Sequence, residues 1–322
     1  MSPEAPVPLP HEVNIEKSST KVETHAPEHI GSVTVERSKI DFDGLKDACT
    51  EYDLIEFTPD SHDYNDVIFY SGFSTRGGKK IKTLAALSQE ANARVLTWDH
   101  LEGQKIGPLR YQHEEDIPRQ QLQKIVAIDN ILKHEEVALA DIVAHSEGSI
   151  HAITTAYLNP SKYKNILLLN PAGLIPMNSS DLILQGIDEG IMRKKSGETN
   201  EEITGMREML DRGRELLDHA SMLIESIRGI SKVSRSEIMW EMIREIRKQG
   251  ITVSMVYTDN DDLFRPEEYE SEAMKHSDEG LNGVFNAVYR LDGDHSSLLK
   301  PEYAKVVSSF ISSNQEELEK VA

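Results

Sequence analysis

The stretch DIVAHSEGSI, residues 141–150, decides the fold. It leaves a short apolar run typical of a buried strand, and from Gly148 onward its pattern is typical of a helix. Ser146 stands between the two, with small residues two positions away on either side, Ala144 and Gly148. A serine at so tight a turn crowds these neighbours, and small side chains relieve the crowding. The stretch therefore allows two interpretations, an ordinary helix cap or a turn that presents Ser146 as a nucleophile.

Strand-like and helix-like segments alternate on both sides of this stretch. The strand-like runs are VIFY (67–70), RVLTW (94–98), ALADIVA (138–144), NILLLNPAG (165–173), ITVSMVYT (251–258) and GVFNAVYRL (283–291). Such alternation predicts an α/β fold with a mostly parallel central sheet and helices on both faces. Active groups of such sheets collect at the carboxyl ends of the strands, which is where Ser146 lies.

The chain divides into three kinds of segment. Residues 1–29 are rich in Pro, Glu, Ser and Thr, which predicts a flexible N-terminal tail. Residues 30–175 and 250–322 carry the alternation and form the predicted core. Residues 176–249 are almost wholly helical in pattern, which predicts a helical cap or lid over the carboxyl edge of the sheet. Seven of the ten methionines lie there; we favour helix packing over a flexible acyl-binding lining as their role.

The composition argues against several partners. A formal net charge of −20 over 322 residues disfavours nucleic acid and anionic membrane surfaces, because both are bound largely through cations. The single cysteine leaves no internal disulfide and no thiolate metal cluster. No apolar run reaches the roughly 18 residues of a membrane span, and the first residues do not resemble a secretory signal. We therefore expect a cytoplasmic protein.

The sequence does not match three common ligand-binding motifs, the phosphate loop, the calcium loop and the H-E-x-x-H zinc motif. GFSTRGGKK (72–80) has two glycines at the interval of a phosphate loop, but Gly78 stands where lysine is required. DNDDLFRPEEYE (259–270) has Leu263 and Phe264 at the ligand and glycine positions of a calcium loop. The twelve histidines include no H-E-x-x-H pair. We therefore expect neither a metal ion nor a cofactor.

The sequence Ala-His-Ser-Glu-Gly at 144–148, placed between a strand and a helix, resembles the nucleophile elbow of the α/β-hydrolase superfamily. The family pattern is Gly-x-Ser-x-Gly, so alanine replaces the first glycine here. The resemblance is to esterase- and lipase-like serine hydrolases and covers roughly residues 30–175 and 250–315. The segment between these ranges matches the family only in its position, as a cap.

The resemblance also implies a catalytic acid and a histidine, which follow the serine in chain order. Counted from the strand at 251–258, Asp261 takes the place of the acid; counted back from Pro266, Asp262 is the alternative. His295, after the last strand, takes the place of the histidine. In this family the histidine accepts the serine proton and the acid orients the imidazole.

Two backbone amides complete the implied site as an oxyanion hole. One belongs to Glu147, the residue after the serine. The other is that of Phe73, because YSGFSTRGG resembles the His-Gly-x loop of the family with Ser71 in place of the histidine. We interpret His145 as a packed or hydrogen-bonded neighbour, and the Glu147 carboxylate as complementing the helix dipole.

The sequence thus predicts a serine hydrolase that cleaves a carboxylic ester or related acyl bond of a small molecule through an acyl-enzyme. Thioester, lactone and carbon–carbon bonds are cleaved by the same apparatus within the superfamily. The alternative is a non-catalytic member that binds a small molecule or a protein partner through the capped pocket. The departures at Ala144 and Ser71 keep this alternative open, and an intact set of acid, base and nucleophile counts against it.

Overall fold

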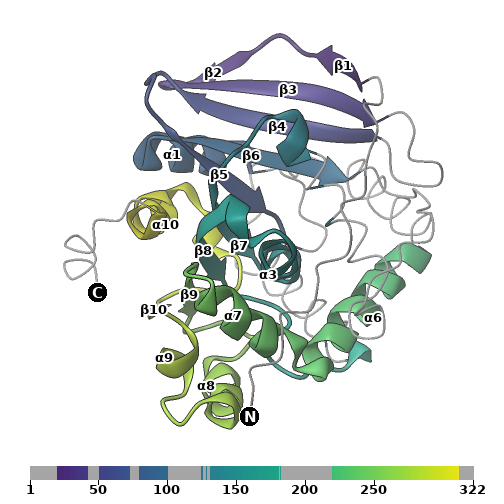
Figure 1. The fold of residues 1–322 in the computed structure, drawn as a ribbon, viewed down its shortest axis with the longest axis vertical. Coiled ribbons are helices and arrows are strands. Elements are labelled where there is room, and N and C mark those ends of the chain that lie inside the picture. Colours follow the sequence, from purple (N-terminus) through teal and green to yellow (C-terminus); the bar gives the residue numbers. More distant parts are fainter. Residues whose placement is uncertain are drawn as a thin grey trace, which may run out of the picture.

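A single twisted sheet forms the centre of the molecule (Figure 1). The computed structural model describes residues 20–42, 51–72, 80–100, 131–180 and 220–311, with the single residues 125, 128 and 182. Within these residues the sheet has ten strands in the order β1-β3-β4-β6-β5-β7-β8-β9-β10, with β2 also paired to β3. The strands are β1 (Thr20–Thr24), β2 (Glu28–Ile30), β3 (Val33–Phe42), β4 (Glu51–Pro59), β5 (Asn65–Tyr70), β6 (Ala93–His100), β7 (Ala140–His145), β8 (Tyr163–Leu169), β9 (Thr252–Thr258) and β10 (Ala287–Leu291).

The sheet changes direction at β6. From β6 through β5, β7, β8 and β9 to β10, every pair of neighbouring strands is parallel. The strands on the other side, β1 to β4, join one another and β6 in antiparallel pairs. The predicted α/β class with a mostly parallel sheet is therefore confirmed. None of the described helices has both the length and the apolar character needed to cross a membrane.

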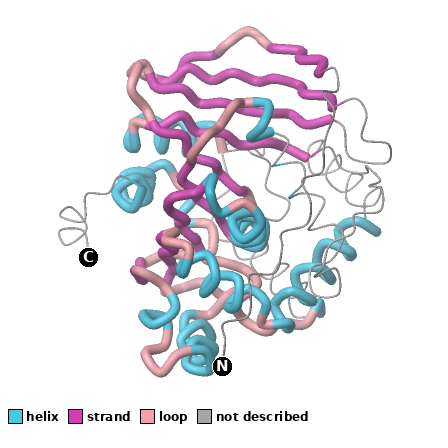
Figure 2. Tube along the Cα trace, in the orientation of Figure 1, coloured by secondary structure: helices cyan, strands magenta, loops and turns pink. Residues whose placement is uncertain are grey.

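Helices cover both faces of the sheet (Figure 2). The α-helices whose two ends are both described are α1 (Ile81–Ala91), α3 (Gly148–Leu158), α6 (Ala220–Ser236), α7 (Ile238–Lys248), α8 (Pro266–His276), α9 (Leu281–Val284) and α10 (Ala304–Ile311). Apolar residues of α1 and α10 share one core cluster, and those of α3 and α7 share the other. Each cluster also takes alternate residues from the parallel strands.

The run VIFY shows why these strands read as continuously apolar. Val67 and Phe69 point into the cluster with α1 and α10, whereas Ile68 and Tyr70 point into the cluster with α3 and α7. All four are at most 2% exposed. A strand covered on both faces buries every side chain, so the alternation of polar and apolar residues is lost.

Two strands lie inside the segment predicted as a flexible tail. β1 pairs with the far end of β3, from Thr20 opposite Phe42 to Thr24 opposite Ser38, and β2 pairs with its beginning. The prediction of a tail is therefore wrong for residues 20–29. These short, polar edge strands gain their hydrogen bonds from β3, and nothing in their own composition shows that partner. Residues 1–19 lie outside the described residues.

Helix α7 belongs to the layer that covers the sheet, although the sequence places it in the cap. Met239, Met242 and Ile243 are at most 1% exposed and lie in the same core cluster as α3. The Trp240 indole N–H donates to the Leu174 carbonyl at 3.1 Å. Helix α7 therefore lies within the segment predicted as a cap and packs in the core, and for its two methionines the favoured packing role is what the structure shows.

The rest of the predicted cap is described only at its two ends. In α6, the Ser231 hydroxyl donates to the Met177 carbonyl at 2.8 Å, which joins the end of this helix to the segment after β8. Residues 183–219 lie outside the described residues, so a cap over the sheet edge stays a prediction.

A truncation in α7 tests whether this helix is part of the core. Ile243 is fully buried, so Ile243→Ala should lower the free energy of unfolding by about 2–5 kcal/mol, as cavities in cores do. The control Glu245→Ala removes only an exposed pair with Lys248 and should change it by less than about 1 kcal/mol. Urea denaturation measures both. A loss at Ile243 as small as that of the control would mean that α7 is dispensable to the core.

Candidate active site

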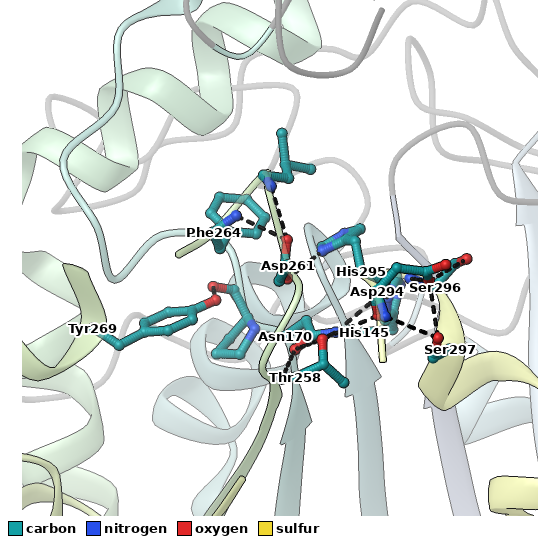
Figure 3. Close-up of polar contacts among 12 residues, drawn as sticks. His145, Asn170, Thr258, Asp261, Phe264, Tyr269, Asp294, His295, Ser296 and Ser297 are labelled. Carbon is teal, nitrogen blue, oxygen red and sulfur yellow. Dashed lines mark hydrogen bonds and ion pairs between the residues drawn. The ribbon is translucent and has the colours of Figure 1, made fainter. Parts of the chain in front are cut away.

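The predicted site residues follow the carboxyl ends of neighbouring parallel strands. Ser146 comes directly after β7, Asp261 comes three residues after β9, and His295 comes four residues after β10. Because parallel strands end at the same edge, all three are brought to one edge of the sheet. Figure 3 shows the polar contacts that connect the segments after β8, β9 and β10 to the end of β7.

Ser146 sits in a left-handed backbone conformation, with φ of 53°. Its amide donates to the Leu169 carbonyl of β8, and its carbonyl accepts from the amides of Ser149 and Ala172, all at 3.0–3.1 Å. For a residue other than glycine this conformation is costly, and it persists only where the surroundings impose it. The hydrogen bonds on both sides of Ser146 supply that constraint. They fix a sharp turn from β7 into α3, as the sequence predicts.

Glycines allow the end of β5 to pass close to this turn. A Cβ on Gly148 would lie 2.8 Å from the Ser71 carbonyl oxygen and closer still to that of Tyr70. A Cβ on Gly72 would lie 2.9 Å from His145 Nδ1 and 3.0 Å from Ser146 Cβ. Neither space admits a side chain. The small residue expected two places after the serine is thus required by the backbone of β5, and the loop after β5 begins against Ser146.

Asp261 and His295 form a buried pair. Their carboxylate Oδ2 and imidazole Nδ1 are 2.7 Å apart, and Asp261 and His295 are only 2% and 6% exposed. The other carboxylate oxygen, Oδ1, accepts from the amides of Leu263 and Phe264, both at 2.9 Å. A carboxylate can only accept, so the imidazole carries its proton on Nδ1, and Nε2 of the neutral ring is left as an acceptor.

The neighbouring aspartates have other environments. Asp262, the alternative acid, is exposed. Asp294 uses Oδ1 to accept from the Ser296 amide and the Ser297 hydroxyl at 2.9 and 3.0 Å, which makes it a turn residue. Asp261 is the aspartate whose carboxylate bonds to the His295 ring.

Two side chains hold the backbone of His295 from the other side. The His295 carbonyl accepts from His145 Nε2 at 2.9 Å and from Asn170 Nδ2 at 3.0 Å. The rings of His145 and His295 lie 4.8 Å apart between centroids. Since His145 directly precedes Ser146, these contacts attach the histidine loop to the serine turn. The interpretation of His145 as a hydrogen-bonded neighbour agrees with this geometry.

Asn170 extends the connection to β9. Its Oδ1 accepts from the Thr258 amide at 2.9 Å, and the Thr258 hydroxyl donates to the Asp294 carbonyl at 3.0 Å. Asn170 is fully buried and, like Ser146, has a left-handed backbone, with φ of 43°. One amide side chain therefore joins the ends of β8 and β9 to the histidine loop.

Tyr269 of α8 supports the segment after β8. Its hydroxyl donates to the Pro171 carbonyl at 2.7 Å in a fully buried position. Burial, with a contribution from the Asp261 charge, raises the pKa of this phenol well above its ordinary value. The hydroxyl therefore remains a proton donor throughout the neutral and mildly alkaline range.

Of the two predicted oxyanion donors, Glu147 lies among the described residues and Phe73 does not. Glu147 directly precedes the first residue of α3, and its carboxylate is buried, with Oε1 3.9 Å from His151 Nε2. Phe73 lies outside the described residues, although Gly72 before it lies against Ser146. The carboxylate of Glu147 thus faces a histidine of the same helix, in addition to its place at the start of the helix.

Comparison with solved structures identifies the fold. Cfl2 from Burkholderia cenocepacia aligns over 86% of this chain and 96% of its own, with a TM-score of 0.55 and 15% identity. A thioesterase domain from the curacin biosynthetic pathway aligns over 91% of this chain and 99% of its own, with a TM-score of 0.50 and 16% identity. The enol-lactonase from Burkholderia xenovorans LB400 aligns over 82% and 97%, with the same score and identity. The chain has the α/β-hydrolase fold.

The fold assignment agrees with the resemblance carried by residues 144–148. No protein-family model matches the sequence, and no curated protein matches it. The identities to the solved structures are low, so the likeness establishes how the chain is folded, and the chemistry is argued from its own residues.

Sequence reasoning missed Asn170 and the role of Thr258. Each stands at the carboxyl end of a strand-like apolar run, and neither belongs to the elbow, acid or histidine patterns. An available signal was the Asn-Pro pair directly after LLL, because asparagine tolerates the left-handed conformation and is common where a strand turns. Its contact with a residue 125 positions away could not be read from that pair.

Removal of the Asn170 side chain tests the connection. Asn170→Ala leaves the buried Thr258 amide without its acceptor and should lower the free energy of unfolding by about 2–4 kcal/mol. It should also weaken the downfield proton NMR signal of His295 Nδ1–H, because the His295 carbonyl loses one of the two side-chain hydrogen bonds that hold it. Asn165→Ala is the control, since Asn165 bonds to Asp141 at the opposite end of the sheet. A signal equally affected in both variants would contradict the assigned role.

Proposed function

We propose that this α/β-hydrolase-fold protein is a serine hydrolase that cleaves carboxylic esters or related acyl bonds. The observation that carries the proposal is the buried Asp261–His295 pair, held at the same sheet edge as the strained turn at Ser146. A buried aspartate on Nδ1 fixes the tautomer in which Nε2 can accept a proton. The histidine loop is anchored to His145, next to the serine, which favours proton transfer from Ser146.

In the proposed reaction Ser146 Oγ attacks the acyl carbon while His295 Nε2 takes its proton. Asp261 keeps the imidazole oriented and stabilises its cation without taking the proton itself. His295 then gives the proton to the leaving group, and an acyl-enzyme remains on Ser146. Water, activated by the same imidazole, attacks that ester and regenerates the serine. No step requires a metal ion or a cofactor.

The developing negative charge on the acyl oxygen needs donors near the serine. We propose the amides of Glu147 and Phe73, because the first lies at the start of α3 and the second follows Gly72, which lies against Ser146. Loss of one such donor typically costs about 3 kcal/mol of transition-state stabilisation. The positive end of the α3 dipole acts in the same direction.

A small-molecule acyl compound is the proposed substrate class. Two solved structures that share the fold are a thioesterase domain and an enol-lactonase, so thioesters and lactones are the first related bonds to test beside simple esters. The alternative, a non-catalytic protein that binds a small molecule or a protein partner through the same region, predicts no covalent chemistry at Ser146.

A fluorophosphonate probe tests the nucleophile. The folded protein should be labelled on Ser146, and Ser146→Ala should abolish labelling, as detected by mass spectrometry of the tryptic peptides. Ser149→Ala is a matched control, because Ser149 is a buried serine in the first turn of α3, three residues after Ser146. This variant should keep full labelling. A well-folded protein that takes up no probe would favour the binding alternative.

Single replacements of the two adjacent aspartates test the acid. Asp261→Asn should lower kcat for a nitrophenyl ester by about 10³–10⁴-fold, because the asparagine no longer fixes the reactive tautomer of His295. Asp262→Asn should leave kcat within about twofold, since this side chain is exposed. Steady-state hydrolysis at pH 8 measures both. The reverse result, with only Asp262→Asn inactive, would reject the pairing of Asp261 with His295 during turnover.

A further inference from the structure

A second group of chemically active side chains lies on α8, away from the site described above. Glu272 and His276 stand one turn apart on this helix, and Glu237 stands at the junction between α6 and α7. One potential ligand atom from each of the three lies within 4.8 Å of the others. The group contains two carboxylates and one imidazole.

Two atoms of this group are buried without a hydrogen-bond partner among the described residues, Glu272 Oε1 and His276 Nε2. The side chains of these residues are only 6% and 8% exposed, and the two atoms are 3.9 Å apart, within ion-pair range but too far for a hydrogen bond. Buried polar atoms are nearly always satisfied, so a facing pair that is left open calls for an explanation. A cation between them satisfies both at once.

The imidazole is held in place from one side. The Trp240 ring stacks on His276 with centroids 4.8 Å apart and planes 19° from parallel. Trp240 is itself fixed by its hydrogen bond to Leu174 and is 1% exposed. A ring that is already oriented loses little freedom when it binds a ligand.

Lys275 neutralises only part of the group. Its Nζ lies 2.5 Å from Glu272 Oε2, while its side chain is 60% exposed. This contact uses the second carboxylate oxygen of Glu272 and leaves Oε1 and the imidazole open. Two carboxylates against one ammonium also leave a net negative charge, which favours binding of a cation.

We propose that Glu237, Glu272 and His276 bind a divalent transition-metal ion, with Zn²⁺ the best match. An imidazole ligand favours Zn²⁺ and its neighbours in the first transition row over Mg²⁺ and Ca²⁺, which prefer oxygen ligands alone. Ligands at about 2.0–2.2 Å from a tetrahedral ion lie roughly 3.3–3.6 Å apart, so the buried pair, at 3.9 Å, needs to close by about half an ångström. The exposed Glu237 side chain moves in to complete the site, with water as the fourth ligand.

Such an ion would fasten α8 to the α6–α7 junction. The two segments are separated by α7 and β9 in the sequence, so the ion would act as a cross-link between distant parts of the chain. Its role is structural and independent of the proposed hydrolysis, because none of its three ligands takes part in the contacts around Ser146 or His295.

Calorimetric titration with ZnCl₂ tests the proposal on the full, untagged chain after dialysis against a chelator. We expect one saturable Zn²⁺ site, a rise in Tm on adding Zn²⁺, and no response to MgCl₂. His276→Gln and Glu237→Gln should each raise the Kd at least tenfold. His134→Gln, which changes a partly exposed histidine beside Glu135, is the matched control and should bind as the unchanged chain does. Glu237 is exposed, so its variant tests the site without disturbing the core.

Removal of the Lys275 ammonium, which competes with the metal for Glu272, should change the Kd in the opposite direction. Lys275→Ala frees Glu272 Oε2 for the metal and should lower the Kd several-fold, an effect that a purely structural role of these residues would not produce. The proposal is overturned if Zn²⁺ binding is absent, or if His276→Gln and Glu237→Gln bind Zn²⁺ as tightly as the unchanged chain, which would place the ion on other surface groups.

Discussion

The close approach of β5 to the turn after β7 is the constraint on which the carboxyl edge depends. Only hydrogen fits at Gly148 and Gly72, because the carbonyls of β5 and the side chains of His145 and Ser146 fill the space. This contact holds Ser146 in a left-handed backbone conformation, which is unfavourable for a residue other than glycine. It also places the start of α3 directly after the turn and brings the loop after β5 against the serine. A larger residue at either glycine would separate β5 from β7 and relax the turn.

The second determinant is a set of hydrogen bonds between strand ends. Each parallel strand delivers its next segment to the same edge, but nothing in the sheet fixes how those segments lie against one another. The Asp261 carboxylate accepts a hydrogen bond from the His295 ring. The His295 carbonyl accepts from His145 and Asn170, and the carbonyl of the preceding residue, Asp294, accepts from Thr258. The bonds to His295 are buried, so each of them is made in a low-dielectric setting where an unmade bond is costly. The loops are thereby held to one arrangement.

The errors of the sequence interpretation have a common cause. Residues 20–29 form strands because β3 offers them partners, and α7 belongs to the core because its apolar side meets α3 and the sheet. Both are decided by contacts with distant segments, whereas composition and periodicity report only local tendencies. The cluster of Glu237, Glu272 and His276 was not predicted from the sequence for the same reason. A search for paired histidines at fixed spacing does not find a carboxylate supplied by a distant segment, here the junction between α6 and α7.

The sequence by itself determined the α/β alternation, the sharp turn at Ser146 and the order in which serine, aspartate and histidine follow their strands. Apolar runs buried on both faces and small residues beside a crowded turn are local requirements, so they leave a local record in residues 67–70 and 144–148. Only the tertiary structure decided that Asp261 rather than Asp262 faces His295, that Asn170 anchors the histidine loop, and that α7 covers the sheet. These outcomes depend on which strand ends lie side by side and on the direction of each side chain at the edge, and both are set by packing across the whole sheet.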